Sequence, residues 1–232
     1  MHSSTMPSRK GRCRSSTFVC RSLPSLLAVA VAAAMMGRAP GGPAAEGVKD
    51  LDVFLDELYR YGLKNNMWNV RPADGRFLQL MTAATGAKRV LELGTANGYS
   101  GIWMLRSLKE GGGKLTTVEI SEVKAREART NFEKAGLAEF ADVKVGDVAK
   151  LLPTLEGPFD LIFLDTEKQA YLDHLKLALP LLKPGGVLLA HNVILMKDSM
   201  AEFLQTIETH PQLITSIVQT SDDGFSVSYR KK

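Results

Sequence analysis

The sequence predicts an α/β domain with a seven-stranded, mostly parallel sheet, helices on both faces and an antiparallel C-terminal hairpin. Between residues 89 and 192, short apolar runs alternate with stretches of helical periodicity, and repeated strand–helix units form parallel sheets covered on both faces. Near the C-terminus, two apolar runs flank the turn-forming residues Ser221-Asp222-Asp223, which is the pattern of a hairpin.

The individual elements follow from the same patterns. Leu51, Phe54, Leu55 and Leu58 recur at helical spacing in an amphipathic stretch over 48–66, and a turn and a second helix follow. Ser121 and Gly136 are residues that begin and end a helix. We expect strands over 89–94, 114–120, 141–147, 159–165, 186–192, 213–220 and 224–231, and further helices over 99–109, 121–136 and 200–210.

Length and charge restrict the organisation of the chain. The 232 residues suit one domain, expected over 46–232, preceded by an appendage. The net charge is +4, but six of the 29 basic residues and none of the 25 acidic residues lie in residues 1–45. The domain therefore has 23 basic and 25 acidic residues, so its charge gives no reason to expect a nucleic-acid partner.

Residues 1–45 have the order of an export signal: a basic start, the apolar run "LLAVAVAAAMMG" at 26–37, and small residues after it. We expect a periplasmic or secreted protein, with an organellar transit peptide or an uncleaved membrane anchor as alternatives. The run of twelve residues is short for a membrane span, which needs about 20. Both cysteines, Cys13 and Cys20, lie here, so the domain has no disulfide and no thiol catalyst.

Polar residues gather where predicted parallel strands end. Ligands of such sheets bind at the carboxyl ends of the strands, and these positions hold Glu92, Gly94, Glu119, Asp147, Asp165 and His191-Asn192. The loop "LELGTANGYSG" lacks the G-x-G-x-x-G pattern of nicotinamide sites. It fits a nucleoside without a pyrophosphate, with Glu119 accepting both ribose hydroxyls. The alternative is a structural turn beside a solvated Glu119.

The motifs "VLELGTANGYS", "VEI", "VGD", "FDLIFLDTEKQAYL" and "LLKPGGVLLAHNVI" resemble, in order and spacing, the S-adenosylmethionine-dependent O-methyltransferases of the catechol and caffeoyl-CoA type. "WNVRPADGRFL" also resembles that family's substrate- and carboxylate-binding turn. The resemblance covers about residues 48–232 and implies a Rossmann-like class I methyltransferase fold, with S-adenosylmethionine as cofactor.

The resemblance also implies roles for single residues. Val70 and Ser100 would hold the methionine carboxylate of the cofactor, and Glu119 would bind its ribose. Asp147 and Val148 would border the adenine. Glu92, Gly94 and Asp165 would also line the cofactor-binding site. Asp165 and Asn192 become metal ligands and Lys168 the catalytic base. Apart from the resemblance, Asp165 would be read as a helix cap and Lys168 as a surface residue.

His191 departs from the family, which has Asp-Asn where this chain has His191-Asn192. Imidazole nitrogen suits manganese, iron, cobalt or zinc better than magnesium. Three interpretations are open: a transition-metal site at Asp165, His191 and Asn192; a metal-independent enzyme in which His191 is the base; or a degraded site. His174 and His210 fall on predicted helical stretches and are interpreted as surface or packing residues.

The expected function is methyl transfer to a hydroxyl of a small phenolic or catechol-like acceptor. No insertion suits a bulky coenzyme A ester, and Trp68 is a candidate wall for a planar acceptor. The competing hypotheses are a non-catalytic module that binds S-adenosylmethionine and a nicotinamide oxidoreductase, which the missing central glycine disfavours. A homodimer is left open, and a membrane contact is expected only if the leader is uncleaved.

Overall fold

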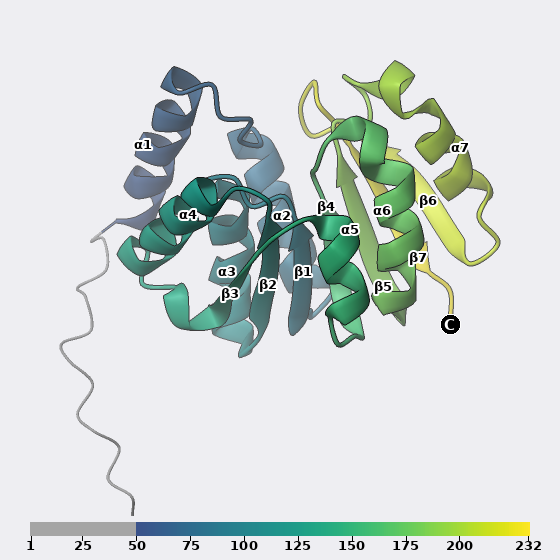
Figure 1. The fold of residues 1–232 in the computed structure, drawn as a ribbon, viewed down its shortest axis with the longest axis horizontal. Helices are drawn as coiled ribbons and strands as arrows, with labels where there is room; N and C mark the ends of the chain where they lie inside the picture. The colour runs from purple at the N-terminus through teal and green to yellow at the C-terminus, as the bar shows by residue number, and fades with distance from the viewer. Residues whose placement is uncertain (1–49) are drawn as a thin grey trace, which may run out of the picture. The chain divides into compact units, whose positions relative to one another are not determined.

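The computed structural model describes residues 50–232 (Figure 1). The predicted leader, residues 1–45, lies outside the described residues. Seven helices with α-helical geometry are found in the described part: α1 (Leu51–Lys64), α2 (Pro72–Ala84), α3 (Tyr99–Gly111), α4 (Glu122–Lys134), α5 (Val148–Leu151), α6 (Tyr171–Ala178) and α7 (Ala201–Thr209). The strands are β1 (Arg89–Leu93), β2 (Lys114–Glu119), β3 (Ala141–Val145), β4 (Phe159–Leu164), β5 (Leu182–His191), β6 (Leu213–Val218) and β7 (Phe225–Arg230).

The sheet confirms the predicted fold class. Its order is β3-β2-β1-β4-β5-β7-β6. The first five strands are parallel, and β7 pairs antiparallel with both β5 and β6. Because β1 lies between β2 and β4, the chain reverses its direction of winding at β1, and ligands of such sheets bind at this switch point.

Helices cover both faces of the sheet, and each face has its own apolar core (Figure 1). Successive side chains of a strand point to opposite faces. In β4, Leu161 and Phe163 therefore join the core that includes α2 and α3, whereas Ile162 and Leu164 join the core that includes α6 and α7. All four are fully buried, as expected for a sheet covered on both sides.

Local signals explain where the helices begin. The Asp50 carboxylate accepts hydrogen bonds from the amides of Asp52 and Val53, so α1 begins at Leu51 rather than at residue 48. Pro72 occupies the first position of α2, where its missing N–H costs nothing. Ser121 accepts from the amide of Lys124 at the start of α4, as predicted.

The placement of His210 on a helix was wrong. His210 follows α7 in an extended conformation, which the next residue, Pro211, favours for steric reasons. No helix among residues 50–232 is long and apolar enough to cross a membrane.

Candidate active site

The carboxyl ends of β1 and β4 lie against each other at the switch point. The Asp165 amide donates to the Leu93 carbonyl at 2.9 Å. Gly94 has a φ of +101°, and a Cβ atom there would lie 2.1 Å from the Asp165 carbonyl oxygen. Only glycine fits this position, because any side chain would separate the two strand ends. Gly94 is therefore required by a close contact within the protein itself.

Glu119 ties the end of β2 to the glycine-rich loop. One carboxylate oxygen accepts from the Ala96 amide and the other from the Ser121 amide, both at 2.9 Å. The residue is only 6% exposed. Each carboxylate oxygen can accept more than one hydrogen bond, so Glu119 can hold the loop and still accept from ribose hydroxyls.

Glu92 lies underneath this loop, fully buried. Its two oxygens accept from the hydroxyls of Ser100 and Thr117, each at 2.6 Å. Burial raises the pKa of the Glu92 carboxyl to about 8, against these two hydrogen bonds. Glu92 and Ser100 were both predicted to bind the cofactor. In the structure they form a hydrogen bond with each other below the loop.

The other predicted cofactor residues occupy turns that lead into helices. Val70 is buried and precedes Arg71, the residue at the N-terminus of α2. Asp147 caps α5 by accepting from the Ala149 amide at 2.8 Å, and Val148 is buried at the start of that helix.

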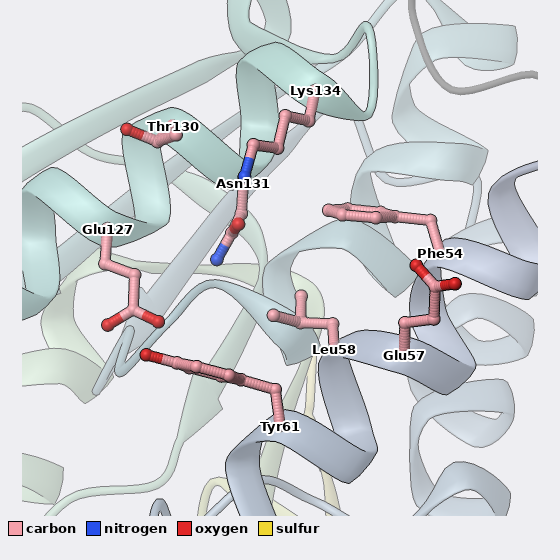
Figure 2. A pocket seen from close by; sticks show the side chains of 8 residues that line it. All are labelled: Phe54, Glu57, Leu58, Tyr61, Glu127, Thr130, Asn131 and Lys134. Atoms are coloured by element: carbon pink, nitrogen blue, oxygen red, sulfur yellow. The ribbon is translucent and has the colours of Figure 1, made fainter. Parts of the chain in front are cut away.

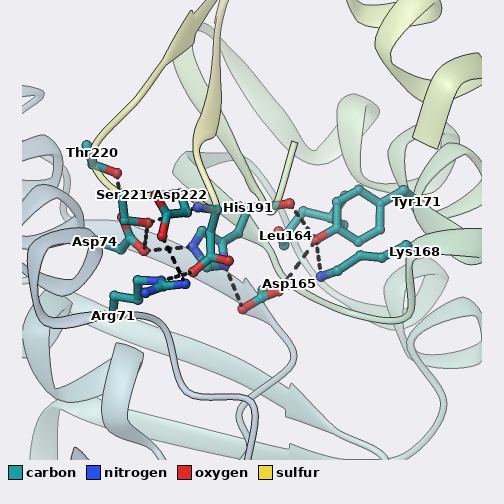
Figure 3. A network of polar contacts seen from close by, with 11 residues as sticks. Arg71, Asp74, Leu164, Asp165, Lys168, Tyr171, His191, Thr220, Ser221 and Asp222 are labelled. Carbon is teal, nitrogen blue, oxygen red and sulfur yellow. Dashed lines mark hydrogen bonds and ion pairs between the residues drawn. The ribbon is translucent and has the colours of Figure 1, made fainter. Parts of the chain in front are cut away.

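Asp165, Lys168 and Tyr171 form a compact group where β4 ends (Figure 3). The Lys168 ammonium donates to Asp165 Oδ1 at 2.8 Å and to the Tyr171 hydroxyl at 2.9 Å. That hydroxyl is also 3.2 Å from the carbonyls of Leu164 and His191, so Tyr171 connects the ends of β4 and β5. The sequence reasoning assigned it no role.

Charge determines the protonation state of Asp165. Burial favours its neutral form, but the charges of His191 and Lys168 outweigh burial and hold its pKa at about 2. Asp165 is therefore a carboxylate at neutral pH. The Lys168 and Asp165 side chains are each 15% exposed, so the pair sits at the edge of the protein interior.

His191 lies between two carboxylates at the end of β5. Its Nε2 is 3.1 Å from Asp74 Oδ2, and its Nδ1 is 3.5 Å from Asp165 Oδ2. The second distance is longer than a hydrogen bond, and the buried Nδ1 has no hydrogen-bond partner among residues 50–232. Burial lowers the pKa of His191, but Asp165 and Asp74 outweigh it and raise the pKa to about 9. Asn192 follows with a φ of +61°, a left-handed conformation that Asn tolerates.

Asp74 is a residue that the sequence reasoning missed. It is fully buried in the first turn of α2 and accepts from the hydroxyls of Thr220 and Ser221 as well as facing His191 (Figure 3). Burial raises its pKa, but these contacts outweigh burial and lower the pKa below its usual value. In the sequence, Asp74 has the pattern of an ordinary acid at a helix N-terminus, and nothing near it indicates His191, 117 residues away.

Trp68 and His174 lie outside this group. Trp68 is 90% exposed in the turn between α1 and α2, outside the core formed by residues 50–232. His174 is buried on α6, and its Nδ1 is 2.9 Å from the Thr166 hydroxyl. Burial lowers the pKa of His174, consistent with the expected packing role.

A groove of about 380 Å³ separates α1 from α4 (Figure 2). Phe54, Leu58 and Tyr61 line it from α1, and Asn131 and Lys134 are among its residues on α4. Asn131 also donates to the Asn97 carbonyl of the glycine-rich loop at 2.9 Å. None of the predicted cofactor, metal or catalytic residues lines the groove, so we assign no chemistry to it.

Comparisons with known proteins show the family of this chain. An O-methyltransferase family model matches residues 45–218. Catechol O-methyltransferase of Niastella koreensis is 42% identical over 130 residues, which are 54% of this chain and 58% of that protein. The chain thus spans less than two thirds of that relative. Catechol O-methyltransferase of Mycobacterium tuberculosis is 35% identical over 175 residues, 68% of this chain and 79% of that protein.

Solved structures agree with the sequence relatives. The structure of the O-methyltransferase from Bacillus cereus in complex with SAH has a TM-score of 0.71 and 32% identity, and the match covers 79% of this chain and 92% of that chain.

Proposed function

Because the chain belongs to the S-adenosylmethionine-dependent O-methyltransferases of the catechol and caffeoyl-CoA type, we propose that its acceptor is a small catechol-like phenol and that a divalent cation assists the transfer. Two relatives carry the name catechol O-methyltransferase, which supports a small phenolic acceptor. In the reaction, the acceptor oxygen bonds to the methyl carbon, the carbon–sulfur bond breaks with its electron pair moving to sulfur, and the hydroxyl proton leaves.

The cofactor side of the site fits an adenosyl group. Gly94 keeps the loop after β1 free of side-chain atoms close to Asp165, and Glu119 presents a buried carboxylate at the next strand end. These residues would hold the nucleoside, and Glu119 would accept from its ribose hydroxyls. Positioning of the methyl group against the acceptor oxygen supplies much of the rate in such transfers.

The observation that carries the metal proposal is the position of His191 Nδ1, which a cation would occupy in place of a proton. Nδ1 is buried, has no hydrogen-bond partner in the described part of the chain, and lies 3.5 Å from Asp165 Oδ2. Two atoms at this separation can both lie about 2.0–2.2 Å from one ion, the usual bond length for nitrogen and carboxylate ligands. Asp165, His191 and the adjacent Asn192 would hold the cation. When bound, it would stabilise the negative charge that develops on the acceptor oxygen.

A second cluster is a weaker metal site. Atoms of Asp74, His191 and Asp223 lie within 4.8 Å of one another. However, Asp223 accepts from Arg71 at 2.9 Å, and Asp74 accepts from Thr220 and Ser221. Protein donors therefore already satisfy the acids on the Nε2 side of His191, which favours the Nδ1 side for the cation.

Lys168 would receive the acceptor proton. Its ammonium group contacts Asp165, so a hydroxyl bound beside Asp165 would lie within reach of Nζ once the lysine is neutral. His191 is a poorer base, because carboxylates face both ring nitrogens and a pKa of about 9 keeps the ring protonated at neutral pH in the absence of a cation.

The test is a methyl-transfer assay on the full chain, with catechol as acceptor and guaiacol, which has one hydroxyl already methylated, as the matched control. We expect methylation of catechol, loss of activity with a chelator, and recovery with manganese, iron, cobalt or zinc that exceeds recovery with magnesium. Turnover that is insensitive to the chelator would overturn the metal proposal. Failure to methylate any phenol would overturn the proposed acceptor class.

A further inference from the structure

The buried carboxylate of Asp74 has no part in the proposed chemistry, yet it makes the closest polar contact of His191. It belongs to the first turn of α2 and is 0% exposed. Its Oδ2 lies 3.1 Å from His191 Nε2 and accepts from the Ser221 hydroxyl at 2.7 Å, while Oδ1 accepts from Thr220. Three donors on one buried carboxylate favour its charged form, so Asp74 presents a full negative charge to the imidazole.

The partner of one imidazole nitrogen determines the state of the other. A neutral ring that donates from Nε2 to Asp74 carries its lone pair on Nδ1, and Nδ1 is the atom that faces Asp165. The ring also packs against Phe225, with centroids 4.8 Å apart, and against Phe163 at 6.4 Å. It is therefore held in one orientation by aromatic contacts and by a hydrogen bond to Asp74.

We propose that Asp74 is a positioning residue that holds His191 with Nε2 donating and Nδ1 free to ligate the cation. The inference rests on the proposed metal site. It also suits a histidine at position 191, where the family that the chain resembles has Asp, because a ligating histidine needs an acceptor for its second nitrogen and Asp74 on α2 supplies one.

The loop between β6 and β7 takes part in the same arrangement. Thr220 and Ser221 contact Asp74, and Asp223 pairs with Arg71, which precedes α2. Arg71 and Asp223 thus fasten the loop to the start of α2. Among the described residues Asp223 makes no hydrogen bond to the His191 imidazole, so it serves as a control for loosening of the loop.

The experiment measures Co²⁺ and Mn²⁺ affinity of the full chain by calorimetry, with the Co²⁺ absorption spectrum as a second readout. Asp74→Asn keeps the shape and an acceptor but removes the charge; Asp74→Ala removes both. Metal affinity is expected to fall about tenfold in Asp74→Asn and up to about a hundredfold in Asp74→Ala, the usual range for loss of such a partner. Affinity for S-adenosylhomocysteine should be unchanged, and Asp223→Asn should bind metal like the wild type.

The outcomes separate this inference from the proposed function. If Asp74→Asn and Asp74→Ala both bind metal with wild-type affinity, the inference about Asp74 is overturned and the proposed metal site is not affected. Equal losses in Asp223→Asn and Asp74→Asn would also overturn it, because either the loop would have loosened or the cation would bind between Asp74, His191 and Asp223. A wild-type chain that binds neither metal would remove the metal site and the inference together. If Asp74→Ala does not fold, the isosteric Asp74→Asn decides alone.

Discussion

Glu92 and Asp165, at the ends of neighbouring strands of one sheet, have pKa values shifted in opposite directions. Glu92 on β1 meets only hydroxyl donors among its described hydrogen-bond partners, and its pKa rises to about 8. Asp165, directly after β4, faces the cationic side chains of His191 and Lys168, and its pKa falls to about 2. Burial acts on both, so the neighbours decide which carboxyl is charged.

The difference divides the carboxyl edge of the sheet into two parts. On the side of β1 and β2, hydroxyls and backbone amides surround the acids, an environment suited to the hydroxyls of a nucleoside. On the side of β4 and β5, Asp74, His191, Asp165 and Lys168 form a line of alternating charge, suited to a cation and to proton transfer. The predictions below separate these two parts.

Lys168→Met should have the largest effect. Loss of the proposed base is expected to lower kcat by about 10²- to 10⁴-fold, with affinity for S-adenosylhomocysteine unchanged, because the substitution alters only the side of β4 and β5. Steady-state kinetics and calorimetry measure the two quantities. Lys176→Met, which breaks an exposed pair with Asp173, is the control. A kcat within threefold of the wild type would show that Lys168 is not the base.

Glu119→Ala should affect cofactor binding on the side of β1 and β2. Affinity for S-adenosylmethionine is expected to fall by about 1.5–3 kcal/mol, the range for hydrogen bonds to a charged group, while kcat at saturating cofactor changes little. Calorimetry of wild type, Glu119→Ala and the surface variant Glu122→Ala provides the comparison. Unchanged affinity in Glu119→Ala would refute the ribose assignment.

Glu92→Gln should show the raised pKa of the Glu92 carboxyl as a change in how the free energy of unfolding depends on pH. The folded pKa of about 8 exceeds the ordinary value of 4.5, so the contribution of Glu92 is complete below pH 4.5 and is lost as pH rises towards 8. The free energy of unfolding of the wild type should therefore fall by at most about 1.4 kcal/mol per pH unit in this window.

The Glu92→Gln variant lacks this dependence, because its amide side chain stays neutral at every pH. His191 acts in the same direction between pH 6.5 and 9, but equally in both proteins, so the difference between the two curves isolates Glu92. Urea unfolding at several pH values measures it, and parallel curves would contradict a neutral Glu92.

The strand ends and the Ser121 cap could be predicted from the sequence, but the long-range contacts could not, for a physical reason. Ser121 accepts from Lys124 three residues later, so the cap can be recognised from a local pattern, whereas Glu119 and Gly94 meet Ala96 and Asp165 of other strand–helix units. The contacts of Asp74 with His191 and with Thr220 span 117 and 146 residues, and they exist only once β5 and the β6–β7 loop fold against α2. Tyr171 was missed in the same way, because its carbonyl partners belong to two strands.

The burial of Glu92 also escaped prediction. A glutamate at a strand end has the pattern of a ligand contact, but its hydroxyl partner Thr117 lies on the neighbouring strand β2, and only the register of β1 against β2 brings the two together.

The ratio of turnover with manganese to turnover with magnesium tests most directly the proposal that Asp165, His191 and Asn192 bind a transition metal. It should be measured for the wild type, for His191→Asp, and for His191→Asp with Asp74→Asn, which avoids leaving the buried Asp74 charge without its imidazole partner. We predict a ratio well above one in the wild type and a shift towards magnesium in both variants, because oxygen ligands replace nitrogen. Equal ratios in all three proteins would contradict the claim.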